Sequence, residues 1–302
     1  PQEVKELGDV GNDLKIYGNK LYAVINCSNY LEVMDAGTAK HIAKIAVPNC
    51  RYLAFKGKYA YLTSYAGPVD PNNSRIGYVA KIDTATLKVV AECTVGYQPE
   101  EMAVVGNKLY IANSGGYNPL NYDRTVSVID LDTFTELYKI DVGINLHRIR
   151  PDHHGNIYVS SRGDYYNTPS MTFIIDSGTD KVTDVLHTLP NSNMVVQNDM
   201  LYLYSTQWSH ITQKMTTSYA VFDIGAKRVT TRSFICDGTE KDIKVPYGIA
   251  VHPHSGELLV TDAGNYISAG VLHCYSPEGI RKWSVSTGDI PAHIAFTTKR
   301  LK

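Results

Sequence analysis

Short apolar stretches that alternate with polar residues recur along the whole chain, and Gly, Asn or Pro bounds most of them. This period of two predicts half-buried β-strands and excludes helical arrays. One strand type returns six times with a tyrosine or leucine at a fixed place, marked by Tyr22, Tyr61, Tyr110, Tyr158, Tyr202 and Leu259. The markers lie about 40–57 residues apart, a period typical of propellers and other repeat arrays.

Each repeat predicts four short antiparallel strands. An apolar strand opens it, as at 99–105 and 246–252, and a hairpin containing Gly or Asn leads into the tyrosine strand. A variable loop precedes a third strand that ends in aspartate, and an amphipathic fourth strand follows a turn. The aspartates are Asp35, Asp83, Asp130, Asp176 and Asp223. We expect them to cap their own turns and not to act as catalytic or calcium-binding groups. Such units, repeated radially, are the blades of a propeller.

The number of blades depends on how the ends are interpreted. Six complete repeats run from about residue 11 to residue 289, after which 291–298 begins a further inner strand and 3–10 is typical of an outer strand. Because a propeller closes when its termini share a blade, the sequence predicts an all-β, seven-bladed β-propeller over residues 1–302, as a single domain. The last blade would lack its middle strands, which we expect in a segment of roughly 30–40 residues upstream of Pro1. A six-bladed propeller is the alternative.

The candidate binding surface is the face on which the loops between second and third strands meet the connections between blades; we call it the loop face. These loops, at 26–30, 64–75, 113–124, 160–170, 205–216 and 262–268, are long and rich in Tyr, Asn, Ser and Gly. Tyrosine is abundant, at 22 residues against 6 Phe and 2 Trp. Aromatic faces among amides favour a large, partly apolar ligand rich in amide or hydroxyl groups. The alternative is that the loops only cover the blades.

Sixteen residues are candidates for ligand binding because of their loop position and chemistry. They are Tyr30, Arg51, Tyr65, Asn113, Tyr117, Tyr122, Arg124, His147, Arg148, Arg162, Tyr165, Tyr166, Trp208, Tyr247, Tyr266 and His293.

The charged residues bear on whether the protein binds nucleic acid, the histidines on whether it binds a metal, and the cysteines on whether it forms a disulfide. Lys and Arg number 29 against 30 Asp and Glu, which lacks the basic excess of a nucleic-acid binder. No stretch has the roughly 18 apolar residues that span a bilayer.

The turn histidines are His153, His154, His252 and His254. We interpret these histidines as surface residues of turns and not as ligands of a metal. The cysteines are Cys27, Cys50, Cys93, Cys236 and Cys274. Free thiols are favoured, with a Cys27–Cys50 disulfide as the alternative.

Two segments resemble one known family. TDAGNYISAGVLHCYSPEGIRKWSVSTGDIPAHIAF, at 261–296, is similar to the closing segment of the YncE-like, DUF5074-type surface propellers of Bacteroidetes. ELGDVGNDLKIYGNKLYAVINCSNYLEVMD, at 6–35, resembles their first full blade. Between them, VSVIDLDT and GNKLYIANSGG are general to YncE-like propellers, so the resemblance covers the whole chain. Members carry an extra N-terminal segment that completes the last blade, in line with the predicted gap.

The resemblance implies a location, a ligand and a partner. Family members are lipoproteins held at the cell surface, on the outer membrane, by an N-terminal cysteine, here outside the given sequence. BtuG-type members capture cobalamin and pass it to a TonB-dependent transporter. We therefore expect a corrinoid ligand, such a transporter as partner, membrane contact only through the lipid anchor, and no catalytic cofactor or metal.

Two other functions stay open. A protein- or glycan-interaction propeller would use the same loops. A metal-dependent propeller lactonase or lyase would recruit residues near the channel, namely Glu100, Asn145, His147, Asn193 and His293. The chain has no recognisable catalytic motif and few acidic residues at the blade connections, so we expect a binding protein and not an enzyme.

Overall fold

The computed structural model describes residues 7–209, 213–231 and 233–298. Its strands form six antiparallel sheets of four, and each sheet takes four consecutive strands in chain order. The fold is therefore an all-β, six-bladed β-propeller. The described residues include no helix with the length and apolar character needed to cross a bilayer.

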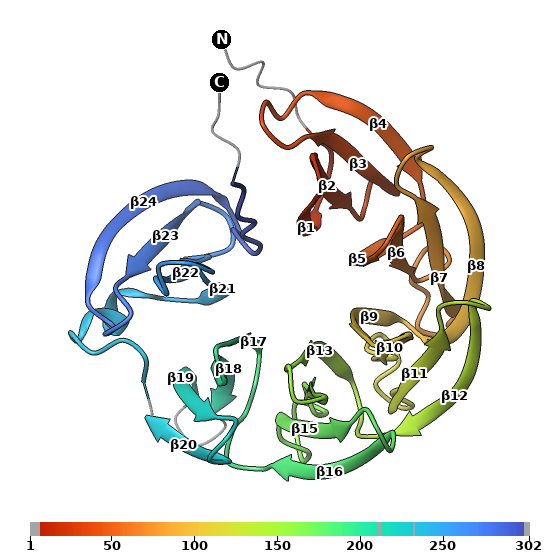
Figure 1. Cartoon of the computed structure of the whole chain (residues 1–302). Helices are drawn as coiled ribbons and strands as arrows, with labels where there is room; N and C mark the ends of the chain where they lie inside the picture. Colours follow the sequence, from red (N-terminus) through yellow and green to blue (C-terminus); the bar gives the residue numbers. More distant parts are fainter. Residues whose placement is uncertain (1–6, 210–212, 232, 299–302) are drawn as a thin grey trace. The chain divides into compact units, whose positions relative to one another are not determined.

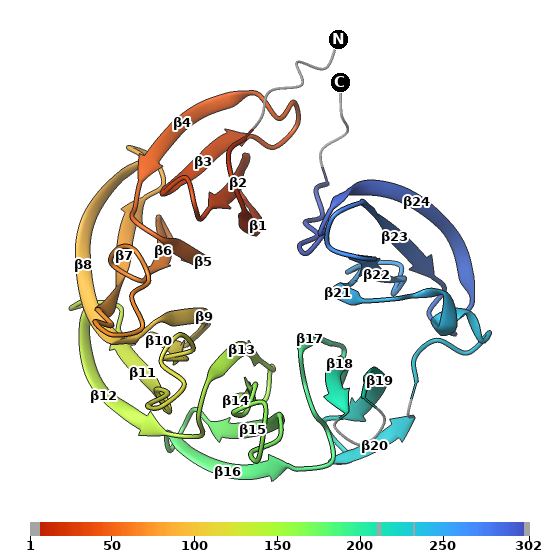
Figure 2. The same cartoon turned by 180° about the vertical axis from the view of Figure 1, so that it is seen from behind.

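The chain forms two compact units, and unit 1 comprises Pro1–Ile149 with Ala295–Lys302. Its first sheet contains β1 (Gly11–Tyr17), β2 (Lys20–Ile25), β3 (Tyr30–Asp35) and β4 (His41–Ala46). Its second contains β5 (Cys50–Lys56), β6 (Tyr59–Ser64), β7 (Ile76–Asp83) and β8 (Lys88–Tyr97). Its third contains β9 (Pro99–Val105), β10 (Lys108–Asn113), β11 (Thr125–Asp130) and β12 (Thr135–Asp141). Strands β1, β5 and β9 lie side by side as the inner strands (Figures 1 and 2).

Unit 2 comprises Arg150–Ile294. The fourth sheet contains β13 (Leu146–Pro151), which begins in unit 1, with β14 (Asn156–Ser161), β15 (Met171–Asp176) and β16 (Lys181–Leu186). The fifth contains β17 (Asn193–Gln197), β18 (Met200–Ser209), β19 (Lys214–Asp223) and β20 (Arg228–Thr231). A 3-10 helix, η1 (Thr239–Asp242), precedes the sixth sheet, which contains β21 (Pro246–Val251), β22 (Leu258–Asp262), β23 (Ala269–Tyr275) and β24 (Arg281–Asp289).

Two local features explain why the repeat folds as blades. Four of the six turns between first and second strands have two residues, with positive φ where a tight hairpin requires it, as at Gly18 (φ 60°) and Gly57 (φ 57°). Each expected aspartate ends the third strand of its sheet, and its carboxylate accepts a hydrogen bond from the backbone of the next turn. At Asp130 the backbone N–H of Thr133 donates to Oδ1 at 2.8 Å and is the main cause of a lowered pKa. The predicted turn caps are confirmed.

The core lies between neighbouring sheets. Tyr22, Leu31, Leu53 and Leu62 are fully buried members of one apolar cluster shared by the first and second sheets of unit 1. The marker tyrosines of the first four repeats are all buried, so the repeated tyrosine strand is a core strand. Burial of these large side chains, at about 1.5–3 kcal/mol each, holds adjacent blades together.

The predicted seventh blade is wrong. Residues 291–298 form no strand, residues 7–10 form none, and residues 3–6 of the expected outer strand lie outside the described residues. The prediction failed because the backbone at the start of an inner strand recurs here without the strand. Asn49, Gln98 and Asn145 take positive φ directly before an inner strand. Ile290 also takes positive φ, at 48°, directly before Pro291. A strand also needs a neighbouring strand to pair with, and none of the six described sheets includes residues 291–298.

The expected loop at 205–216 is also mostly strand. Strands β18 and β19 continue as one extended hairpin, in which Trp208 pairs with Met215. Thr and Trp side chains favour a pleated backbone, and they outweigh the polar residues from which we inferred a loop. All five cysteines are free thiols, so the disulfide alternative is wrong.

Candidate functional site

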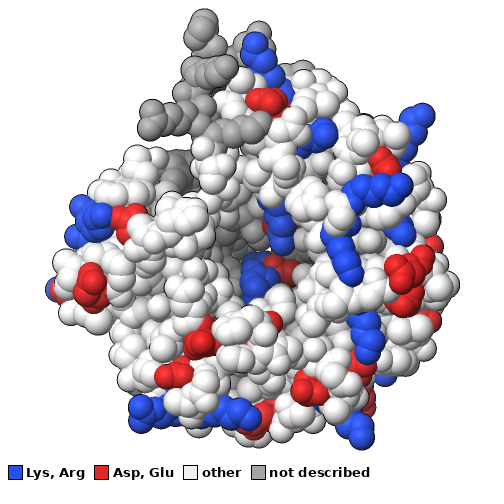
Figure 3. Space-filling model, in the orientation of Figure 1, with Lys and Arg blue, Asp and Glu red and all other residues white. Residues whose placement is uncertain are grey.

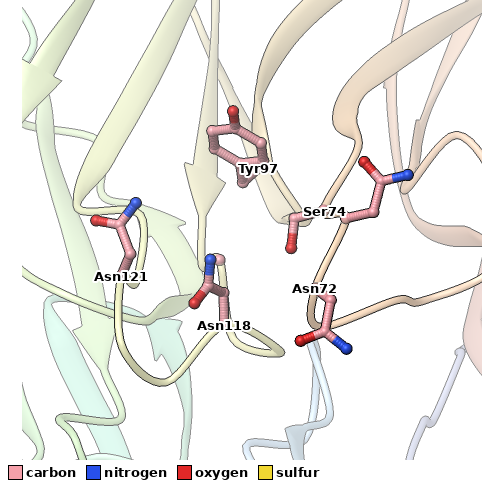
Figure 4. Close-up of a pocket in the computed structure, with 7 residues that line it drawn as sticks. Asn72, Ser74, Tyr97, Asn118 and Asn121 are labelled. Carbon is pink, nitrogen blue, oxygen red and sulfur yellow. The ribbon is translucent and has the colours of Figure 1, made fainter.

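A pocket of about 250 Å³ opens on the loop face of unit 1, between the loop that joins β6 to β7 and the loop that joins β10 to β11 (Figure 4). Asn72 and Ser74 line it from the first loop, and Asn118 and Asn121 from the second. Tyr97, at the end of β8, adds an aromatic wall. The remaining lining residues are Asn73 and Gly115.

The lining presents polar groups that other described residues leave available. The hydroxyl oxygen of Ser74 is buried and has no hydrogen-bond partner among the described residues. The Asn72 and Asn121 side chains are exposed, and that of Asn118 is half-buried. Each carboxamide offers two donors and one acceptor oxygen, so the pocket suits a ligand with matching amide or hydroxyl groups.

The second loop is fixed by the connection between β8 and β9. The amide side-chain oxygen of Gln98 accepts a 3.0 Å hydrogen bond from the backbone N–H of Tyr117, and the Gln98 carbonyl accepts one of 3.0 Å from the Ser114 hydroxyl. At the far end of the loop, Asp123 Oδ2 accepts a 2.9 Å bond from the Tyr97 backbone. These contacts confirm that blade connections and second-to-third-strand loops share the loop face, and they hold the pocket's second wall in place.

A buried polar cluster lies on the inner strands of the same unit. Glu100, 2% exposed, accepts a 2.7 Å hydrogen bond from the Tyr65 hydroxyl and forms a 3.3 Å ion pair with Arg51. The Arg51 guanidinium also lies over the Tyr65 ring, 4.8 Å from its centroid. Tyr65 in turn makes an edge contact with the half-exposed Tyr117 ring, with centroids 6.3 Å apart. The cluster thus supports an aromatic side chain that reaches the surface.

A second pair of contacts continues this cluster along β13. Arg148 pairs with Glu101 at 3.6 Å, and the Tyr52 hydroxyl lies 3.0 Å from His147 Nε2. All four side chains are buried. Burial raises the pKa of Tyr52, while the nearby Arg148 opposes that shift. Because these groups are engaged with one another, we assign them to support of the loop face.

Several predicted candidates have structural partners instead. Asn113 is fully buried, and its amide nitrogen donates to Thr125 and Ser127. Arg124 pairs at the surface with Asp141 at 2.7 Å. The Tyr30 hydroxyl donates to the Leu7 carbonyl. Tyr122 is half-buried in the second loop, beside the pocket but not in its lining.

Unit 2 holds the remaining candidates. Tyr247 and Tyr266 make an edge contact with ring centroids 5.8 Å apart, and burial raises the pKa of Tyr266. Tyr165, Tyr166 and Trp208 are exposed, at 61%, 80% and 52%. Arg162 and His293 are half-buried. Among these candidates, unit 2 therefore has three exposed aromatic side chains and one aromatic pair.

Sequence reasoning missed the pocket's own residues. Asn72, Asn118 and Asn121 lie in the right loops, but aromatic and charged residues were preferred to them, and Tyr97 was not among the candidates. The available signal was the clustering of asparagine in PVDPNNSR and NPLN.

Charges on the face shown in Figure 3 are of both signs and interspersed among neutral atoms. No continuous basic surface of the kind that binds nucleic acid is visible there among the described residues. The described clusters of His, Cys, Asp and Glu that could hold a metal do not include Glu100, His147 or His293, three residues of the lactonase or lyase alternative.

The fold and loops define a class, the six-bladed propellers with a polar loop face. Residues 2–297 match the family model described as "Domain of unknown function (DUF5074)", and the chain belongs to that family. No curated protein matches the sequence. Among solved structures, it is similar to Kuenenia stuttgartiensis hydrazine synthase, with a TM-score of 0.75 and 14% identity over 97% of this chain and 91% of that one. An identity this low shows the fold alone.

Proposed function

We propose that this protein binds a large small molecule rich in amide or hydroxyl groups on its loop face, without converting it. The observation that carries the proposal is the pocket between the two loops of unit 1, where Ser74, Asn72 and Asn118 present polar groups beside the Tyr97 ring. Buried polar groups normally have partners, so a buried hydroxyl in a pocket wall favours a ligand or water as its partner.

The pocket volume limits what it can hold. Sites that enclose a drug-sized ligand occupy about 300–1,000 Å³. At about 250 Å³, this pocket suits one arm of a larger ligand, whose body would lie across the loop face. Tyr117, half-exposed and backed by Tyr65, is placed to contact that body.

A corrinoid is the first ligand to test. The corrin ring is broad, partly apolar and rimmed by amide side chains, which suits an amide-lined pocket flanked by aromatic rings. The resemblance to BtuG-type propellers supports the same ligand. It also supports two further parts of the proposal, a cell-surface location through an outer-membrane lipid anchor and delivery to a TonB-dependent transporter. A glycan would meet the same polar groups through its hydroxyls, so it is tested beside the corrinoid.

The test is isothermal titration of the chain with cyanocobalamin, with cobinamide, and with a panel of neutral oligosaccharides. We expect 1:1 binding of the corrinoids that is weakened by Asn72→Ala with Asn118→Ala, since each lost hydrogen bond of about 0.5–1.5 kcal/mol costs roughly two- to tenfold in affinity. Tyr117→Ala should weaken it as well, through lost aromatic contact.

The matched control is Asn19→Ala, an exposed asparagine in the turn between β1 and β2, at the other end of the strands. It should leave affinity unchanged. If the chain gives a heat of binding with an oligosaccharide and none with the corrinoids, the proposed ligand becomes a glycan at the same pocket. Absence of binding to every probe by the folded chain, or equal weakening by Asn19→Ala, would overturn the proposal.

A further inference from the structure

Three side chains of metal-binding type meet at turns of unit 2, at the strand ends away from the loop face. His153 and His154 belong to the turn between β13 and β14, and Asp199 to the two-residue turn between β17 and β18. The sequence favoured surface histidines here because it gave no sign that a carboxylate from another repeat lies beside them.

Both histidines approach the same carboxylate oxygen. Asp199 Oδ1 lies 2.7 Å from His154 Nε2 and 3.3 Å from His153 Nε2. The imidazole centroids are 4.0 Å apart, and the three ligand atoms lie within 4.8 Å of one another. Two imidazole nitrogens and a carboxylate oxygen thus converge on one point, which is the arrangement that a shared metal ion requires.

Backbone contacts fix both turns. Asp152 Oδ1 accepts 2.8 Å hydrogen bonds from the backbone N–H groups of His154 and Asn156, so this carboxylate shapes the histidine turn. Asn198 and Asp199 both have positive φ, at 48° and 59°, as a tight hairpin turn demands. The Asp199 carbonyl accepts a 2.9 Å bond from the backbone of Ile224. The ligand atoms are therefore presented by ordered turns.

We propose that His153, His154 and Asp199 form a site for a transition-metal dication, and that Zn²⁺ is the ion its donors suit best. A tetrahedral zinc with ligands at about 2.0–2.1 Å holds its donor atoms roughly 3.3 Å apart. His153 Nε2 and Asp199 Oδ1 are separated by 3.3 Å, and all three donor atoms lie within 4.8 Å of one another. Two imidazoles and a carboxylate match zinc, whereas Mg²⁺ and Ca²⁺ prefer oxygen ligands throughout.

Exposure fits an ion that enters from solvent. The side chains of His153, His154 and Asp199 are 63%, 47% and 45% exposed, which leaves room for water at the fourth position. The ion would link the turn that follows β13 to the turn that follows β17. Because an ion that binds only the folded state stabilises it, zinc should raise the midpoint of thermal unfolding.

The experiment titrates the purified chain with ZnCl₂ by calorimetry and follows its thermal unfolding, with MgCl₂ as the comparison ion. We expect one zinc per chain, a higher unfolding midpoint with zinc, and neither effect with magnesium. His153→Ala, His154→Ala and Asp199→Asn should each weaken zinc binding by roughly tenfold or more. Asp199→Asn keeps a residue favoured at such a turn, so its fold is preserved.

The matched control is His254→Ala, another exposed histidine in a first-to-second-strand turn, where it has His252 as neighbour. It should bind zinc as the unmodified chain does. The proposal is overturned if the chain takes up no zinc, or if Asp199→Asn and His254→Ala bind it with equal affinity.

Discussion

Glu100 links the buried polar cluster of unit 1, since Arg51 and Tyr65 both depend on its carboxylate. Glu100→Gln keeps the shape of the side chain but removes the charge that Arg51 faces. We expect it to lower the free energy of unfolding by about 1.5–3 kcal/mol, the range for hydrogen bonds to charged groups. Urea unfolding measures the change.

Asp141→Asn is the control for Glu100→Gln. It breaks an ion pair with Arg124 that is shorter, at 2.7 Å, but lies at the surface with both side chains more than half exposed. Water screens such a pair, so the loss should stay below about 0.5 kcal/mol. Equal losses in the two variants would contradict the importance given to burial.

Tyr22 is fully buried, and its hydroxyl has no hydrogen-bond partner among the described residues. Tyr22→Phe should therefore raise the free energy of unfolding by about 1 kcal/mol, while Tyr65→Phe should lower it by a similar amount because its hydroxyl bonds to Glu100. Chemical unfolding of both variants at pH 7 makes the comparison, and a loss of stability in Tyr22→Phe would show that the hydroxyl has a partner.

The same residue predicts a response to alkali. Burial, aided by the neighbouring Tyr17, raises the pKa of Tyr22 to about 12. An unfolded tyrosine titrates near pH 10, so folding favours the neutral form; this contribution is complete below about pH 10 and is lost as pH rises towards 12. The thermal midpoint should fall less steeply over that window in Tyr22→Phe than in the unmodified chain.

At the residue scale, sequence predicted the structural role of some polar groups poorly. Asn113 and Arg124 have the polarity of ligand-binding residues, but their partners, Ser127 and Asp141, lie on other strands. The pairing of β10 with β11 and of β11 with β12 decides those contacts, and no local pattern encodes it.

Among the elements, the loop from β10 to β11 is the one on which the pocket most depends. Gly115 lies in it with φ 55°, and a Cβ there would lie 2.2 Å from the backbone nitrogen of Asp123. Gly115→Ala should therefore displace the loop and weaken ligand binding as well as stability. Gly106→Ala, at a hairpin turn with nearly the same φ of 56° and open space around it, should cost only the backbone strain of about 1 kcal/mol.

Thermal unfolding and ligand titration of these two glycine variants separate strain from steric conflict. If Gly115→Ala bound the ligand as tightly as the unmodified chain, the assignment of the pocket to this loop would be contradicted. Loss of affinity in Gly106→Ala would show that the variants act through general destabilisation.

Elements were predicted well where local rules suffice. The six repeats begin and end with Gly11 of β1 and Asp289 of β24, as expected, because alternation, tight hairpins and Asp turns are all local. Prediction failed where pairing decides. Residues 291–298 carry the local signal of an inner strand but belong to none of the described sheets. Strands β18 and β19 stay paired as far as Ser209 and Lys214, through residues that are polar enough for a loop.

For the whole molecule, the fold constrains function only loosely. Propellers support many activities, and likeness at 14% identity to hydrazine synthase transfers none of them. Function must be argued from sites, and the described residues provide two: a polar pocket between loops of unit 1, and a histidine–aspartate cluster at turns of unit 2. The sequence predicted the surface that carries the first, because long loops on regular blades are visible in the repeat.

The most direct test of the loop-face account is amide hydrogen exchange of the chain with and without saturating cyanocobalamin. The account predicts slower exchange at 66–75 and 114–124, the loops that line the pocket, with no change at the first-to-second-strand turns around Gly18 and Gly57. Protection confined to those turns, or no protection anywhere when binding is shown to be saturated, would contradict it.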